Sequence, residues 1–222
     1  MIEDAIRLIA AAICSEKKKT ELYITPDPAL QPVVDLLMLL SAYADISVTG
    51  RTLVDPIIRL PVDLPLRFNS MTKDVFLLFA GFFAKINVVL KVETVEGGVT
   101  REELQTLSDA MDGVLAFAKK GDGVMLSAFS NGSDRLNPNV AVSPIFAAGA
   151  VLGAVLGYGS TAFTLGQNRN APEVLCAIEA VNAFGGSAEE TEDGAVKVQS
   201  IRNLRFHKKT GKRLRKRVKP CD

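Results

Sequence analysis

Tryptophan is absent from this sequence, and aromatic residues make up only 6% of it. A core with so few rings has to be built mainly from aliphatic side chains. The chain also lacks an uninterrupted apolar run: the longest one, Val140 to Tyr158, is broken by Ser143, Pro144 and glycines, whereas a transmembrane helix needs about 20 mostly apolar residues. The N-terminus carries no basic leader segment, so we expect neither a membrane span nor a secretory signal.

Histidine and cysteine are scarce. The single histidine, His207, excludes a metal cluster built on histidines. Three cysteines at wide spacing, Cys14, Cys176 and Cys221, argue against a disulfide framework and against a metal site. Cys14 and Cys176 stand in apolar helical contexts and are predicted to be core residues. We therefore expect an intracellular protein, cytoplasmic or nuclear, without a metal and without a cofactor.

Charge is present but unevenly divided. The composition, with 48% hydrophobic and 23% charged residues, is that of a globular protein. Residues 202–222 contain ten Lys/Arg and one Asp, a net charge of +9, whereas residues 1–201 contain 16 Lys/Arg and 24 Asp/Glu, a net charge of −8. An acidic body (1–201) therefore carries a basic arm (202–222). The arm's cations are Arg202, Arg205, Lys208, Lys209, Lys212, Arg213, Arg215, Lys216, Arg217 and Lys219.

Such a dense row of cations repels itself, and its natural partner is a polyanion. Phe206 is the only aromatic residue of the arm, so contacts to phosphates would dominate over stacking on bases. We expect RNA more than DNA. A nuclear targeting signal, or docking onto the acidic body of a neighbouring subunit, are the alternatives.

Periodicity along the body predicts alternating helices and strands. Helices are expected at 3–14, 28–44, 71–84, 100–119, 145–157 and 172–184, and strands at 20–25, 46–49, 52–58, 65–68, 87–93, 123–128, 139–142, 161–165, 188–191 and 195–198. Thr100 and Glu103 form a capping-box pattern, and Asp193-Gly194 predicts a hairpin turn.

The same element order recurs. The strands near Thr20, Ile86 and Ser160 are 66 and 74 residues apart. We therefore expect an α/β (α+β) fold of three β-α-β-α-β-β units, at about 1–58, 59–135 and 136–201, with the opening strand of the first unit missing. Each unit's first helix is apolar and predicted to be buried, and the second more polar and outside. An ordinary α+β domain without true repetition is the alternative.

The third unit carries a family resemblance. Ser143 to Phe146 begins an apolar helix, Ala171-Pro172-Glu173-Val174 begins the next, and Ala183-Phe184-Gly185-Gly186 leads into a glycine-containing hairpin. This layout resembles the enolpyruvyl transferases, which act on 3-phosphoshikimate or UDP-N-acetylglucosamine, and the related RNA 3′-terminal phosphate cyclases. The resemblance implies two halves of three units each, with an active site between them, and this chain has the size of one half.

The resemblance carries over no catalytic residue. The family's phosphate-contacting Gly-Asp-Lys-Ser segment has no counterpart, nor do its catalytic Lys/Asp/Glu set, its cysteine loop or the cyclase histidine. We expect a non-catalytic assembly or docking protein, anchored to RNA by its arm as in a ribonucleoprotein or nucleocapsid, with a protein partner or a second copy. The alternative is an enolpyruvyl-transferase-like enzyme whose active site lies between two chains.

Other motifs have simpler interpretations. Ser70-x-x-Lys73 and Lys209-Thr210-Gly211 match two of the three penicillin-binding signatures, but Ser130-Asn131-Gly132 does not match the third. Ser70 is therefore predicted to be a helix N-cap. Gly149, Gly153 and Gly157 share one helix face and predict close helix packing. Arg169, before a helix N-terminus, is a possible anion site, and Glu102-Glu103 and Glu189-Glu190 are predicted to be solvent-facing charge.

Overall fold

The computed structural model describes residues 1–15, 19–40, 42–47, 49–55, 65–111, 114–128, 143–157, 159–192 and 194–201. Within these ranges the helices and strands group into three units. Unit 1 contains α1 (Ile2–Cys14), β1 (Thr20–Tyr23), η1 (Pro28–Leu30), α2 (Gln31–Leu39), β2 (Tyr43–Ile46) and β3 (Arg51–Asp55). Unit 2 contains β4 (Leu66–Thr72), α3 (Lys73–Phe82), η2 (Phe83–Lys85), β5 (Val88–Glu96), α4 (Arg101–Ala110), β6 (Leu115–Lys120) and β7 (Gly123–Ala128). Unit 3 contains α5 (Pro144–Leu156), β8 (Ser160–Thr164), η4 (Gly166–Asn170), α6 (Pro172–Ala183), β9 (Ser187–Glu190) and β10 (Ala195–Gln199).

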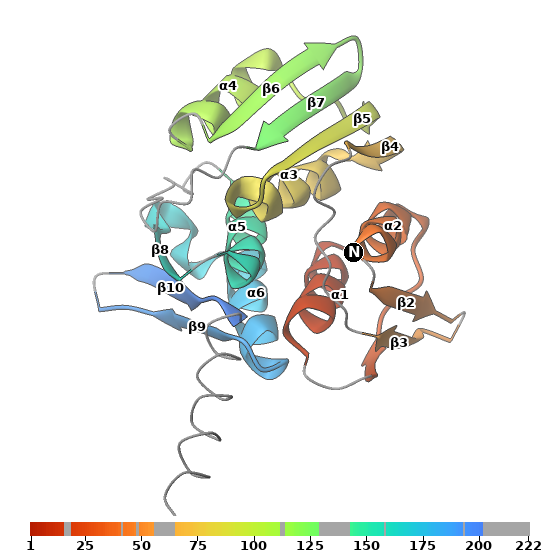
Figure 1. Cartoon of the computed structure of the whole chain (residues 1–222), viewed down its shortest axis with the longest axis vertical. Helices are drawn as coiled ribbons and strands as arrows, with labels where there is room; N and C mark the ends of the chain where they lie inside the picture. The colour runs from red at the N-terminus through yellow and green to blue at the C-terminus, as the bar shows by residue number, and fades with distance from the viewer. Residues whose placement is uncertain are drawn as a thin grey trace, which may run out of the picture.

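The three units share one sheet topology. The strand orders are β1-β3-β2, β5-β7-β6 and β8-β10-β9, and all of these pairs are antiparallel. Unit 2 also has its opening strand, β4, which pairs in parallel with β5. The three sheets lie on three sides of a group of helices (Figure 1). The predicted α/β fold of repeated units is confirmed; the opening strand predicted at 139–142 lies outside the described residues.

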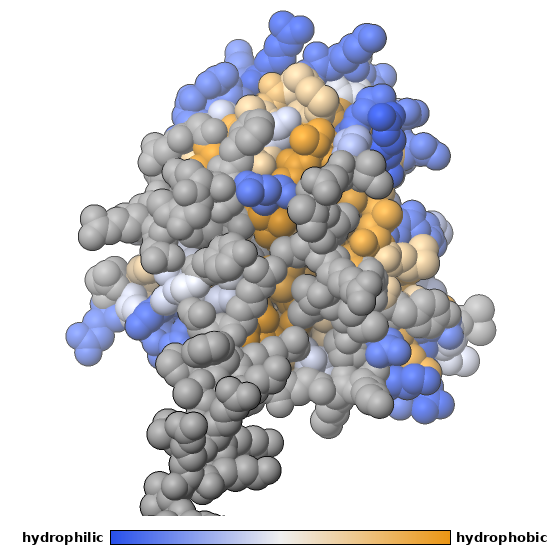
Figure 2. Space-filling model, in the orientation of Figure 1, coloured by the Kyte–Doolittle hydropathy of each residue, from blue (hydrophilic) through white to orange (hydrophobic). Residues whose placement is uncertain are grey.

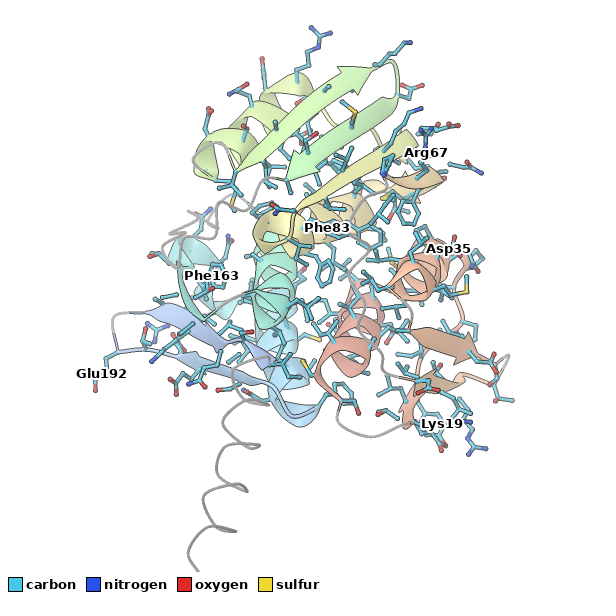
Figure 3. All side chains as sticks on the ribbon, in the orientation of Figure 1. Lys19, Asp35, Arg67, Phe83, Phe163 and Glu192 are labelled. Carbon is cyan, nitrogen blue, oxygen red and sulfur yellow. The ribbon has the colours of Figure 1, made fainter. Side chains whose placement is uncertain are left out.

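The first helix of each unit is buried. Residues 146–156 of α5 are buried on every side, whereas α1, in which Arg7 is exposed, and α3 expose part of their surfaces. A helix that is apolar all round is stable only inside the molecule, which explains the burial of α5, while α1 and α3 turn wide apolar faces towards the same core. The labelled Phe83 lies in this central region, whereas Lys19 and Glu192 are at the periphery (Figure 3).

Glycines allow α3 and α5 to pack backbone to backbone. A Cβ added at Gly149 would lie 2.1 Å from the carbonyl oxygen of Leu78, and one at Gly153 would lie 2.0 Å from that of Phe82. From the other helix, a Cβ at Gly81 would lie 2.0 Å from the carbonyl oxygen of Phe146. The packing role predicted for the first two glycines is confirmed, and a phosphate-loop role has no support here.

Two helices end earlier than predicted. α2 ends at Leu39, and Tyr43–Ile46 forms β2. α4 ends at Ala110, and Leu115–Lys120 is not helical but forms β6, paired with β7. Side chains of β6 alternate between the inner and outer face of the sheet, and Gly121 has a φ of 60° in the tight turn that follows. The helix propensity of Ala and Lys there is overridden by this hairpin.

Two further predictions, the capping box and the two buried cysteines, are confirmed. Thr100 and Glu103 form the capping box of α4, and Cys14 and Cys176 are buried. Burial raises the pKa of the Cys176 thiol, which makes this thiol a poor nucleophile.

None of the helices in the described ranges is both long and apolar enough to cross a membrane. On the face shown in Figure 2, hydrophilic residues occupy much of the rim and hydrophobic residues the middle.

Candidate functional site

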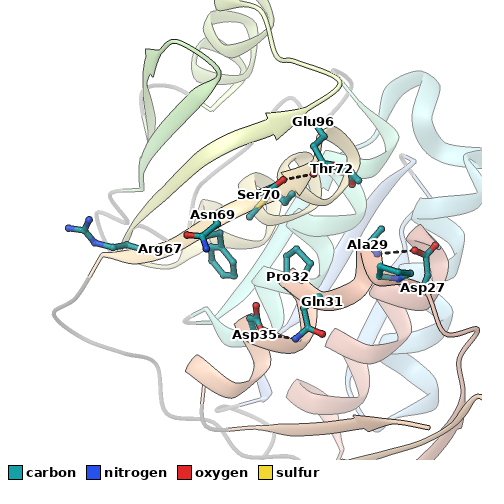
Figure 4. A pocket seen from close by; sticks show the side chains of 13 residues that line it. Asp27, Ala29, Gln31, Pro32, Asp35, Arg67, Asn69, Ser70, Thr72 and Glu96 are labelled. Atoms are coloured by element: carbon teal, nitrogen blue, oxygen red, sulfur yellow. Dashed lines mark hydrogen bonds between the residues drawn. The ribbon is translucent and has the colours of Figure 1, made fainter. Parts of the chain in front are cut away.

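A pocket of about 650 Å³ lies between units 1 and 2. One wall consists of residues 67–72 of β4, and the opposite wall consists of the segment from Asp27 through the first turns of α2 to Asp35. Glu96, the last residue of β5, closes one end. Figure 4 shows the side chains of β4 and those of α2 on opposite sides of this space. We call it the β4–α2 groove.

Local sequence explains the shape of the helical wall. The Asp27 side chain accepts a hydrogen bond from the Ala29 amide at 2.8 Å, and Pro28 occupies the first position of η1. The helix predicted from residue 28 therefore begins as η1, with Asp27 as its N-cap, and α2 follows from Gln31. Pro32 then stands in the first turn of α2. A hydrogen bond from Gln31 Nε2 to Asp35 Oδ1, at 2.8 Å, joins the first turn of α2 to the second.

The strand wall contains Ser70, which is not the helix cap predicted for it. Ser70 lies within β4, and its hydroxyl donates to Glu96 Oε1 on the neighbouring strand. Thr72 is the N-cap of α3, and its hydroxyl accepts from the Val75 amide at 3.4 Å. Ser70 therefore has a carboxylate as its partner, and no lysine among the described residues bonds to it as acyl-transfer chemistry would require.

Lys73, the other residue of that motif, is also occupied. Its Nζ lies 2.5 Å from Glu103 Oε1, so the lysine joins the start of α3 to the start of α4. The hydrogen bond from Lys73, together with the one from the Thr100 backbone amide, lowers the pKa of Glu103 below its ordinary value of 4.5. Glu103 is thus not free solvent-facing charge, as was predicted for it, but a link between two helix ends.

The groove has an excess of negative charge. Among the described residues that line it, Asp27, Asp35 and Glu96 are the carboxylates and Arg67 is the one cation. Asp27 and Asp35 are half-buried, while Arg67 and Glu96 are exposed. A surface of this sign attracts cationic groups and repels phosphate. In the part of the chain that the structure describes, no group of His, Cys, Asp or Glu side chains is arranged to hold a metal ion.

Arg169 lies in η4, directly before α6, as the sequence suggested. Its guanidinium pairs with the carboxylate of Glu190 on β9, and its side chain is half-exposed. A carboxylate therefore occupies the position beside Arg169 that was considered for an external anion. The anion site remains a prediction, and all ten predicted cations of the arm lie outside the described residues.

The main polar residues of the groove were not predicted from the sequence. Arg67 and Asn69 alternate with the buried Leu66 and Phe68, which is the ordinary pattern of a half-buried strand and carries no chemical signal. Asp35 is more than 30 residues away from them in the chain. Nothing in the order of residues brings α2 beside β4, so the groove emerges only from the packing of unit 1 against unit 2.

Comparisons by sequence find no relative: no protein-family model matches the chain, and no curated protein sequence is similar to it. Comparisons by structure do. Over 90% of this chain, the structure is similar to the enolpyruvyl transferase NikO from Streptomyces tendae, with a TM-score of 0.53 and 14% sequence identity. Over 89%, it is similar to the EPSP synthase from Acinetobacter baumannii, with a TM-score of 0.60 and 13% identity.

The fold is that of the enolpyruvyl transferases. The resemblance inferred from the layout of unit 3 is thereby confirmed for the architecture. This chain spans 47% of the length of NikO and 45% of that of the EPSP synthase. At this sequence identity, the structural similarity shows a common fold and does not show a common chemistry.

Proposed function

We propose that this chain is one half of an enolpyruvyl-transferase-like enzyme, whose active site forms between two copies of the chain. The observation that carries the proposal is the match of nine tenths of this chain to slightly less than half of two such proteins. Three units with one topology around buried helices account for that match. This is the alternative expected from the sequence, and the structural neighbours favour it over a purely non-catalytic role.

The charge of the β4–α2 groove explains why a second copy is needed. Both acceptors known for the family, 3-phosphoshikimate and UDP-N-acetylglucosamine, carry phosphate. The groove offers Arg67 against Asp27, Asp35 and Glu96, so one copy alone would repel such an acceptor. A cleft between two copies could bring cations of the second chain to the substrate, while the carboxylates are suited to moving protons.

One experiment tests both the dimerisation of the chain and its enolpyruvyl transfer. In enolpyruvyl transfer from phosphoenolpyruvate, the acceptor hydroxyl forms a new C–O bond and inorganic phosphate is released, so phosphate is the readout. We expect release that depends on an acceptor, rises with dimer concentration, and falls at least tenfold in Arg67→Ala. The matched control is Lys91→Ala, an exposed cation on β5 outside the groove. A monomer at all concentrations, or no release with either acceptor, contradicts the proposal.

A second candidate function belongs to the arm. We infer that residues 202–222 bind RNA or another polyanion, because a net charge of +9 there stands beside −8 in the rest of the chain. Neutralising several phosphates gives tight and salt-sensitive binding without sequence readout. The first test is whether the purified full chain carries nucleic acid, read from its ratio of absorbance at about 260 and 280 nm; a clean protein spectrum after low-salt purification argues against it.

A further inference from the structure

One edge of β4 pairs with no other described strand. Among the described strands β4 pairs only with β5, in a parallel register from Leu66↔Leu90 to Thr72↔Glu96. The β4–α2 groove is lined by consecutive residues of β4, 67 to 72, with η1 and α2 opposite them (Figure 4). Backbone groups at an open strand edge can accept a further strand. A groove between such an edge and a helix is a shape that suits an extended peptide.

The charge of the groove selects the kind of peptide. Of its three carboxylates, Asp27 and Asp35 lie on the helical wall and Glu96 lies beside the strand wall, and Arg67 lies towards one end (Figure 4). The Asp35 and Glu96 carboxylates each accept only one side-chain hydrogen bond from the described residues, from Gln31 and Ser70 respectively. Each therefore has lone pairs left for a cation. A peptide rich in Lys and Arg fits this groove, and a phosphate backbone does not.

The chain contains one segment of that chemistry. We propose that the β4–α2 groove binds the basic arm, residues 202–222, of the same chain. The arm's ten cations and the body's net charge of −8 are complementary. A tethered segment also has a high effective concentration at any groove it can reach. This proposal does not depend on the enolpyruvyl-transferase one.

The arm is long enough to reach the groove. It follows Ile201, which is only 3% exposed and thereby anchors the end of β10. Twenty extended residues span up to about 66 Å. A compact body of about 200 residues has a radius of gyration of about 16 Å and hence a diameter of about 40 Å. The whole arm is therefore longer than the body is wide, and its distal residues, such as Lys216 and Lys219, have the reach to lie in the groove.

Carbodiimide cross-linking of the full chain tests this placement directly, since it joins a lysine amine to a carboxylate in direct contact. The expected products at low salt join Lys212, Lys216 or Lys219 to Asp35 or Glu96 within one chain, with a yield that does not change on dilution. Products that join the arm mainly to Glu189, Glu190 or Glu192 of unit 3 would overturn the proposal. So would products that form only between chains, as shown with mixed light and heavy isotope labels.

Limited trypsin digestion gives an independent readout, because the arm carries nine cleavage sites, one after each Lys or Arg except Lys219, which precedes Pro220. In the double variant Asp35→Asn, Glu96→Gln, which keeps the shape of both side chains, arm cleavage should be several-fold faster than in the unaltered protein. The control Glu189→Gln, Glu192→Gln also removes two charges and should leave the rate unchanged. In about 1 M salt all three proteins should be cleaved alike. Equal rates at low salt, with the arm protected only after RNA is added, would mean that RNA and not the groove is the arm's partner.

Discussion

Glu103 makes two contacts that can be separated by substitution. Its carboxylate accepts a hydrogen bond from the Thr100 backbone amide at 2.8 Å, which completes the capping box, and it forms an ion pair with Lys73. Glu103→Gln keeps the capping geometry and removes the charge. At neutral pH we expect a loss of about 0.5 kcal/mol in the free energy of unfolding, because both partners of the pair are more than a third exposed.

The pH dependence of this loss has a defined sign. The pKa of Glu103 is lowered in the folded protein, so its contribution is fully present above the ordinary value of 4.5 and is lost as pH falls through the folded pKa. Urea unfolding should show the full difference between wild type and Glu103→Gln near pH 7 and a shrinking difference as the pH falls below the ordinary pKa of 4.5. Glu102→Gln, in the same helical turn, is the control for the helix dipole; a loss at low pH as large as at neutral pH would contradict the assignment.

At the scale of elements, Thr72 caps the start of α3, whereas Ser70 lies in β4 and does not. Thr72→Ala removes the N-cap and should lower the free energy of unfolding by about 1 kcal/mol. Ser70→Ala removes one exposed hydrogen bond to Glu96 and should cost less than half of that. Neither protein, nor the wild type, should form a covalent adduct with a β-lactam. Chemical denaturation and mass spectrometry check both points; a larger loss for Ser70→Ala would reverse the two roles.

The pair of central helices depends on its glycines. In Gly149→Ala or Gly153→Ala the new methyl group meets a carbonyl oxygen of α3 at about 2 Å, so the two helices have to move apart. Overpacking of this kind costs about 1–3 kcal/mol or more, although alanine favours the helix itself by about 1 kcal/mol. Thermal unfolding should show a clear drop in Tm for each. Ala183→Gly, a one-methyl change at the exposed end of α6, should lose about 1 kcal/mol at most.

At the scale of the whole molecule, the arm's affinity for RNA can be predicted from counterion release. If about six of its cations contact phosphates, log K should fall with log salt with a slope of about −4 on a single strand. A fluorescence titration at several salt concentrations measures this slope. Without residues 202–222 binding should be lost, since the rest of the chain carries −8. Equal affinity of the full and shortened proteins would show that the arm is not the binding element.

The sequence by itself determined the repeated order of helices and strands, because apolar periodicity reports which faces must leave water. It predicted the burial of α1, α3 and α5 from their predominantly apolar residues, and it predicted close packing at Gly149 and Gly153 from the helix face that they share. It also determined the charge of the arm. Where local signals conflicted, at Leu115–Lys120, helix propensity gave the wrong answer, because strand pairing with β7 outweighs it.

The tertiary structure decided where chemistry can occur. Asp35, Arg67 and Glu96 come from three elements that only the packing of unit 1 on unit 2 brings to one groove. The partners of Ser70, Lys73 and Arg169 are likewise residues at least 20 positions away in the chain, namely Glu96, Glu103 and Glu190. Side-chain pairs of this kind leave no period in the sequence. They follow from how the folded units approach one another, which periodicity alone does not encode.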